Sequence, residues 1–149
     1  MKQIRIIDTT LCTKEGVFGF KEKLEIARQL DMLCVDVIEL PEIQNAKADS
    51  LFVRTAASFV KNSVLSVGAG SSEKSISDAI SALSGAKSGQ IRIELPMSPA
   101  GMEYIAKKKP AAMLTWIESA VKMATESGVE VVFCAMDATR AEKDFLDQA

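Results

Sequence analysis

Several side chains suited to chemistry stand at the ends of stretches that are typical of β-strands. Asp8 follows a first apolar run and Glu39 lies at the end of a second. Ligands of parallel sheets bind at the carboxyl ends of the strands, and carboxylates placed there can act as general bases. Asp8 and Glu39 are therefore candidate catalytic residues. Asp137, Thr139 and Arg140 follow the last apolar run and are suited to binding the carboxylate of a substrate.

Each of these residues also has a structural explanation. Asp8 can accept hydrogen bonds from the backbone of its own loop, and Glu39 can pair with Arg92 or Arg5 inside the fold. The structural explanation is favoured for both carboxylates. For the three residues after the last run, a hydrogen-bonded loop network and a substrate site fit equally well.

Other familiar chemistries have weaker support. The chain has no histidine, which removes the commonest general base and metal ligand. Cys12 follows a strand, but no base is available to activate it as a nucleophile. Gly68–Ser72 is suited to binding a phosphate at a helix start, yet it lacks a dinucleotide or Walker motif, so a turn with an N-cap is favoured. Lys107–Lys109 could contact a CoA phosphate, and a solvated turn is the favoured alternative.

Length and composition predict one domain covering residues 1–149. The chain has 149 residues and a formal net charge of -2, which gives no electrostatic attraction to nucleic acid or to anionic lipid. No apolar run reaches membrane-spanning length, and the N-terminus lacks a signal-peptide pattern. The 3 cysteines are far apart and fit neither disulfide nor zinc spacing, so a cytoplasmic location is predicted.

Apolar runs alternate with helical periodicity along the whole chain. The expected strands are Ile4–Ile7, Val35–Leu40, Ser63–Val67, Ile91–Leu95 and Val129–Cys134. The expected helices lie around residues 20–30, 52–60, 76–83, 114–124 and 141–148. Pro96–Gly101 is expected to be a loop. Ser72 and Pro110 suit helix starts, whereas Asn62, Gly85 and Gly128 suit helix ends.

Strand–helix alternation with short connections predicts an α/β fold with a parallel sheet. Two architectures compete: a closed, doubly wound five-stranded sheet, and a partial (β/α)8 barrel with about five strands. Arg92 and Glu94 lie two residues apart in the fourth strand, so both face the same side. Central strands of doubly wound sheets are usually apolar on both faces, whereas a barrel lumen accommodates a charged layer. This detail favours the partial barrel.

Five segments, in order and with suitable separations, carry a family resemblance. They are Asp8–Leu11 (DTTL), Glu22–Asp31 (EKLEIARQLD), Val35–Glu39 (VDVIE), Met102–Tyr104 (MEY) and Val131–Arg140 (VVFCAMDATR). The sequence resembles the front part of the (β/α)8-barrel, or TIM-barrel, family of isopropylmalate synthase, homocitrate synthase and HMG-CoA lyase. The resemblance covers nearly the whole chain and favours the partial barrel over the doubly wound sheet.

The resemblance also implies a chemistry. Family members condense an acyl-CoA with a 2-oxo acid, or cleave the reverse bond, in carboxylic acid metabolism, and use a divalent metal such as Mg, Mn or Zn. The family glutamate at the position of Glu39 points into the mouth of the active site. Ser98 matches a family serine in the fourth loop and is a candidate substrate-binding residue, with a role in the turn as the alternative.

The departures from the family signature, DTTLRDGEQ, fall on its metal site. Where the family has arginine followed by aspartate, this chain has Cys12 and Thr13. The arginine polarises the acceptor carbonyl and the aspartate binds the metal, and neither a thiol nor a hydroxyl is a good replacement. Lys14 and Gly16 replace a glycine and a glutamine, and only Glu15 is kept.

Two further departures lie outside this signature. Met136 replaces a family glutamate, and the remaining metal ligands, an H-x-H pair, are expected beyond Ala149. No metal ligands and no cofactor are therefore predicted for this chain alone. Cys34 stands where the family usually has glycine after the first helix, and a positive φ there would cost of order 1 kcal/mol.

These departures leave two functions open. The first is a truncated isopropylmalate or homocitrate synthase-like protein, inactive alone and part of a split or oligomeric barrel. The alternative is a subunit of an acyl-CoA:2-oxo acid condensing enzyme, or of an HMG-CoA lyase-type enzyme, that a second chain completes. Both imply a homo-oligomer or a completing chain as partner, with a 2-oxo acid and an acyl-CoA as possible small-molecule ligands.

Overall fold

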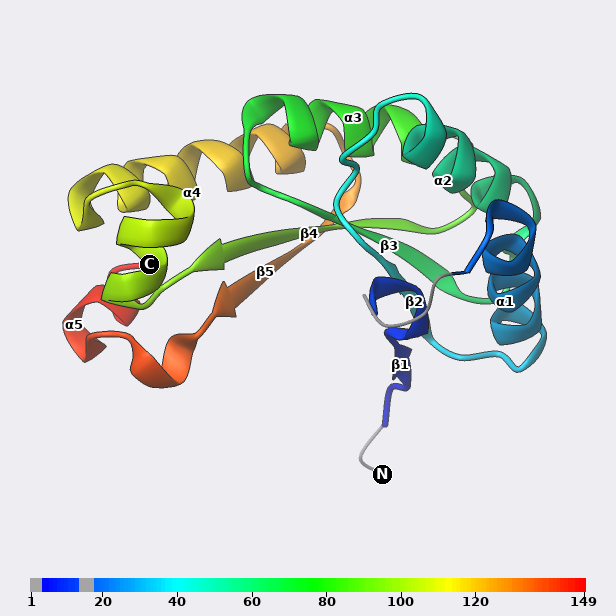
Figure 1. The fold of residues 1–149 in the computed structure, drawn as a ribbon, viewed down its shortest axis with the longest axis horizontal. Coiled ribbons are helices and arrows are strands. Elements are labelled where there is room, and N and C mark those ends of the chain that lie inside the picture. The colour runs from blue at the N-terminus through cyan, green and yellow to red at the C-terminus, as the bar shows by residue number, and fades with distance from the viewer. Residues whose placement is uncertain (1–3, 14–17) are drawn as a thin grey trace.

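The computed structural model describes residues 4–13 and 18–149 (Figure 1), so the signature residues Lys14, Glu15 and Gly16 lie outside the described residues. Its strands form one parallel sheet in which neighbours follow chain order. They are β1 (Ile7–Asp8), β2 (Val37–Leu40), β3 (Val64–Ala69), β4 (Gly89–Pro96) and β5 (Glu130–Met136). A doubly wound sheet reverses its strand order partway. The doubly wound alternative is therefore wrong, and the partial barrel is confirmed.

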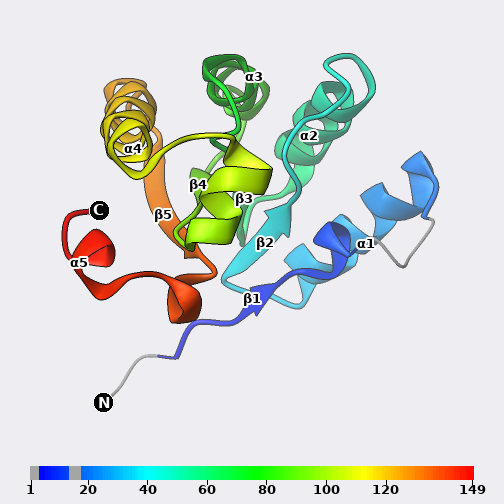
Figure 2. The same cartoon turned by 60° about the vertical axis from the view of Figure 1, so that its left-hand side comes forward.

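Helices cover the outer face of the sheet, which curls into a half-barrel (Figure 2). The α-helices are α1 (Phe20–Met32), α2 (Ala48–Phe59), α3 (Glu73–Leu83), α4 (Pro110–Glu126) and α5 (Lys143–Leu146). Two 3-10 turns, η1 (Thr10–Cys12) and η3 (Ala138–Arg140), follow β1 and β5, and a π-helix, η2 (Gly101–Ala106), follows β4. In the described part of the chain, no helix combines the length and apolar composition needed to cross a bilayer.

The two faces of the sheet differ in chemistry because side chains alternate along each strand. The helix-facing side is apolar and fully buried at its centre, with Ile38, Leu40, Leu65, Val67, Ile91, Ile93 and Leu95. The concave side carries polar residues, and the register places Glu39 beside Ser66 and Glu94 beside Cys134. A core on one side and a polar lumen on the other is the arrangement of a barrel wall.

The bounds of the middle strands lie within 2 residues of the predicted ones, whereas three other element predictions were wrong. The first strand is shorter than Ile4–Ile7, because the Asp36 carboxylate accepts the Ile6 N–H at 2.6 Å in place of a longer ladder. Asn62 does not end α2, which stops at Phe59. Pro96–Gly101 is not a loop as a whole, because Pro96 ends β4 and Gly101 begins the π-helix η2. The last helix, α5, lies within 2 residues of its predicted bounds.

Several predicted helix ends are confirmed. The Ser72 hydroxyl accepts the N–H of Ser75 at 3.2 Å, so Ser72 is the N-cap of α3. Pro110 is the first residue of α4, and Gly128 follows that helix with a φ of 77°. Gly85 lies just past the end of α3. These residues mark the starts and ends of α3 and α4.

A buried carboxylate connects the end of α1 to the start of β3. Asp31 is 6% exposed, and its carboxylate accepts the backbone N–H groups of Lys61, Asn62 and Ser63 at 2.8–3.1 Å. Burial alone acts to raise the pKa of Asp31, but these three N–H groups outweigh it and hold the pKa below its ordinary value. Ionised Asp31 therefore stabilises the native state.

We expect Asp31→Asn to lower the free energy of unfolding by about 2 kcal/mol at pH 7, because an amide cannot accept all of these hydrogen bonds. The folded pKa of Asp31 lies below its unfolded value. Its contribution is therefore complete above the unfolded pKa and is lost as pH falls through the folded pKa. Urea denaturation from pH 7 to pH 3 measures the difference between the two proteins, which shrinks in acid. The exposed Glu126→Gln is the control, and a constant difference across this range would contradict the assignment.

Cys34 takes the left-handed conformation that ends α1. Its φ is 57°, and its N–H donates to the Asp31 carbonyl at 3.1 Å. The positive φ considered for this position from the sequence is therefore present. A side chain in this conformation is strained, and glycine usually fills the position.

We expect Cys34→Gly to raise the free energy of unfolding by about 0.5–1 kcal/mol, because it removes this strain at an exposed position. Thermal unfolding measures the change as an increase in Tm. Cys34→Ala is the matched control, since it removes the thiol but keeps Cβ. An equal gain in both variants would show that the thiol, not the backbone, is the source of the effect.

Candidate functional site

Arg92 is the centre of the polar cluster in the lumen. Its side chain is 7% exposed, and its Nε donates to Glu94 Oε1 at 2.7 Å. Its Nη1 lies 3.5 Å from Glu39 Oε2 and 3.3 Å from the Ser66 hydroxyl. Its Nη2 donates to the Leu40 carbonyl at 3.3 Å. One guanidinium thereby joins β2, β3 and β4 across the concave face.

The charges of this cluster hold Arg92 in its ionised form. Burial alone would lower the pKa of Arg92, but hydrogen bonding and charge attraction from Glu94, with the charge of Glu39, raise the pKa above its ordinary value. The predicted pairing of Glu39 with Arg92 is thus what the structure contains. Two carboxylates face one guanidinium, which leaves one net negative charge in the lumen.

Gly68 makes room for this cluster. It lies beside Arg92 in the register of β3 and β4. A Cβ at this position would stand 2.9 Å from Glu94 Oε2 and 3.1 Å from the backbone N of Glu42. Such contacts are shorter than van der Waals distance, and the second one involves backbone, so only glycine lets the ion pair lie against β3.

The two thiols near the cluster are not activated. Cys12 Sγ lies 4.0 Å from Arg92 Nη2. Burial raises the pKa of the Cys12 thiol, and the charge of Arg92 only partly offsets this. Burial and the charge of Glu94 likewise raise the pKa of Cys134. Since the thiolate is the reactive form, these cysteines behave as neutral groups near pH 7.

The structure does not bring the two catalytic candidates together. The Asp8 carboxylate accepts the N–H of Thr10 at 2.9 Å and its hydroxyl at 3.1 Å, so Asp8 shapes its own loop. The register places Asp8 beside Ile38, on the helix-facing side of the sheet, whereas Glu39 faces the lumen. The favoured structural explanations therefore account for both carboxylates.

Three of the four substrate-binding candidates meet after β4 and β5. A hydrogen bond from Arg140 and a smaller effect of one from Ser98 hold the pKa of Asp137 below its ordinary value. Ser98 is 2% exposed, and its hydroxyl accepts the N–H of Gly101 at 3.0 Å. Thr139 is exposed on η3. These contacts form a hydrogen-bonded loop network, which is the structural alternative to a substrate site.

The full extent of the Arg92 cluster was missed. Two charges on one face of β4 were recognised, but Ser66, Gly68 and Cys12 were not assigned to the same cluster. The signal was the pairing of polar residues at equivalent strand positions, since Glu39 and Ser66 are register partners. This pairing identifies the cluster only when the strand bounds are known to within one residue, because a shift of one residue turns each side chain to the other face of the sheet.

A curled parallel sheet, helices on its outer face and a polar lumen define the chain as part of a (β/α)8 barrel. The HMGL-like family model matches residues 3–149, and the chain belongs to this family. The family resemblance seen in the sequence is therefore confirmed.

Curated relatives of the chain are 2-isopropylmalate synthases. The chain is 39% identical over 145 residues to that of Thiobacillus denitrificans, covering 95% of this chain and 28% of the relative. It is 37% identical over 150 residues to that of Lysinibacillus sphaericus, covering 98% and 29%. For that of Pyrococcus abyssi, the identity is 35% over 150 residues, covering 98% and 31%. The chain thus spans less than a third of the length of these relatives.

Proposed function

We propose that residues 1–149 form the first five strand–helix units of an isopropylmalate synthase-like barrel and are catalytically silent alone. The observation that carries this proposal is the pair Cys12 and Arg92. The family's loop arginine is replaced by a neutral thiol, and the cation of the described lumen, Arg92, is held by Glu39, Glu94 and a backbone carbonyl. A guanidinium bound in this way is not available to polarise an acceptor carbonyl.

The donor groups of this chain do not suit the divalent metal of the family. Within residues 4–13 and 18–149, no three His, Cys, Asp or Glu side chains converge on a point that would hold a metal ion. Thr13 stands at the position of the family's aspartate, and its hydroxyl donates to the Thr10 carbonyl at 2.8 Å. Hard cations require several oxygen ligands, usually with carboxylates among them. We therefore propose no metal-dependent step for this chain alone.

We expect the purified 149-residue chain to give no acyl-CoA condensation or lyase activity. Acetyl-CoA, a panel of 2-oxo acids and Mg²⁺ or Mn²⁺ are the reactants, and the release of free CoA thiol is the measurement. The lyase direction releases no free thiol, so it is followed by the formation of acetoacetate from HMG-CoA. The matched control is the double variant Cys12→Arg, Thr13→Asp, which restores the signature pair and stays silent because no histidine is present. Metal-dependent turnover by the unaltered chain would contradict the proposal.

A second candidate function is a subunit of an acyl-CoA:2-oxo acid condensing enzyme, or of an HMG-CoA lyase-type enzyme, completed by a second chain. The observation that favours it is the exposure of apolar side chains along the two sheet edges. Ile7 of β1 is 54% exposed, and Val132 and Met136 of β5 are 38% and 43% exposed. A closing segment of the barrel would cover these side chains. The three free thiols support a reducing compartment such as the cytoplasm for either function.

A further inference from the structure

A separate pocket lies beside the lumen, at the carboxyl ends of β3, β4 and β5. Its volume is about 290 Å³, near the lower end of the range for small-molecule sites. The lining residues that matter here are Glu42, Glu94, Ile105, Lys108, Trp116 and Met136. Apolar walls with a few charged groups are typical of a site for a small organic ligand.

Trp116 forms a fixed aromatic surface in this pocket. Its indole Nε1 donates to the Gly70 carbonyl at 2.9 Å, which fixes the orientation of the ring. The ammonium of Lys108 lies 5.4 Å from the ring centroid. A cation over the face of an indole is stabilised by the negative charge density of the ring. The pocket therefore already holds an ammonium group that belongs to the protein.

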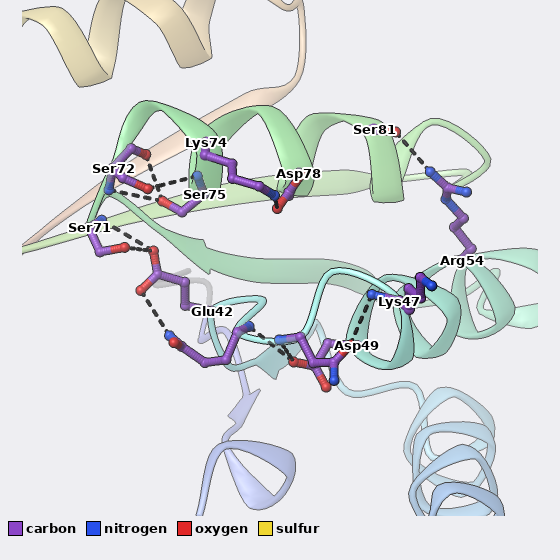
Figure 3. A network of polar contacts seen from close by, with 12 residues as sticks. Glu42, Lys47, Asp49, Arg54, Ser71, Ser72, Lys74, Ser75, Asp78 and Ser81 are labelled. Atoms are coloured by element: carbon purple, nitrogen blue, oxygen red, sulfur yellow. Dashed lines mark hydrogen bonds and ion pairs between the residues drawn. The ribbon is translucent and has the colours of Figure 1, made fainter.

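The place where an anion would bind is already taken by a carboxylate. The start of α3 borders the pocket, and the N-terminus of a helix attracts anions. Glu42 Oε1 accepts the N–H of Ser71 at 3.2 Å and its hydroxyl at 2.6 Å (Figure 3). The Ser72 and Ser75 hydroxyls complete this capping network. A phosphate or carboxylate ligand would meet the charge of Glu42 at this place.

The charges around the pocket favour a cation. Glu42 and Glu94 line it, and Glu94 shares the Arg92 guanidinium with Glu39. Glu39, Glu42 and Glu94 carry three negative charges in this region, and Arg92 and Lys108 carry two positive ones, which leaves one net negative charge. An ammonium ligand that displaces Lys108 restores the same balance, whereas an anion increases the excess of negative charge.

We infer that this pocket binds a small organic ammonium ion. Its charged group takes the place of Lys108 on the Trp116 face, between Glu42 and Glu94, and its apolar part contacts Ile105 and Met136. This inference concerns a site beside the lumen and does not depend on the proposed function.

Trp116 is the single tryptophan of the chain, so its fluorescence and its indole N–H resonance report on this pocket alone. The probes are butylammonium, butyrate and 1-butanol, which have similar length and different charge. We expect butylammonium to change both signals with saturation, whereas butyrate and 1-butanol leave them unchanged up to the same concentration.

Two variants give opposite expected results. Lys108→Met keeps the apolar stem and removes the competing ammonium, so butylammonium should bind about three- to tenfold more tightly. Glu42→Gln removes a carboxylate, and butylammonium should bind about three- to tenfold more weakly. Circular dichroism checks that both variants are folded. Binding of butyrate that is lost in Lys108→Met would overturn the inference in favour of an anion site, and no response to any probe would also overturn it.

Discussion

Replacing Arg92 with leucine should lower the free energy of unfolding by about 3–5 kcal/mol, because it leaves two partly buried carboxylates without their cation. Glu39 and Glu94 lose ion pairs of 3.5 and 2.7 Å, and the Ser66 hydroxyl and the Leu40 carbonyl lose a donor. Small domains have a total stability of about 5–15 kcal/mol, so this loss is a large fraction of it. Urea denaturation, followed by circular dichroism, measures the change.

The triple variant Arg92→Leu, Glu39→Gln, Glu94→Gln separates the effect of charge from that of packing. Removing all three charges avoids the unpaired carboxylates, so we expect most of the lost stability to return. Lys122→Leu on exposed α4 surface is the control for removal of a single positive charge. A loss below about 1 kcal/mol in Arg92→Leu would show that water solvates both carboxylates in the open lumen.

The 149-residue chain should associate at micromolar concentration, because both edges of its described sheet are unpaired. β1 and β5 are the outer strands of the described sheet, and each pairs with a neighbouring strand on one side only. β5 contains no lysine or proline to protect its edge, and Ile4 and Ile6 before β1 are 83% and 59% exposed. Burial of apolar surface contributes roughly 25 cal/mol per Å², so edge-to-edge contact favours a dimer or a complex with a completing chain.

Light scattering across a range of concentrations measures the association. Ile6→Lys and Val132→Lys place a charge beside each edge and should shift the chain toward the monomer. Leu51→Lys is the matched control, because Leu51 is 57% exposed on α2, a helix that packs between α1 and α3. A monomer at every concentration tested would mean that the sheet edges are protected in solution.

The prediction of the fold from the sequence succeeded where two independent signals agreed. Apolar runs gave the five strands, and the alternation of Ile91, Arg92, Ile93 and Glu94 indicated a polar lumen on one side of β4. The π-helix η2 was missed, because Gly101–Ala106 has no recognisable periodicity. Its start depends on the Ser98 hydroxyl, which accepts the Gly101 N–H at 3.0 Å. This contact depends on the path of the chain after the end of β4, which the sequence pattern does not specify.

The site was predicted in pairs but not as a cluster. Glu39 was expected to pair with Arg92, and the loop bonding of Asp8 was expected from its position. The contact between Arg92 and Cys12 joins residues 80 positions apart, and no local pattern predicts it. The space left by Gly68 was likewise missed, since it depends on the register between β3 and β4.

The short distance between Arg92 and Cys12 has a consequence for any return of the family's arginine to position 12. Such an arginine would bring a second guanidinium to the cluster in which Arg92 Nη2 now lies 4.0 Å from Cys12 Sγ. The two cations would repel each other, whereas the net negative charge that Glu39 and Glu94 leave in the lumen would attract both of them. The new arginine would therefore compete with Arg92 for these two carboxylates.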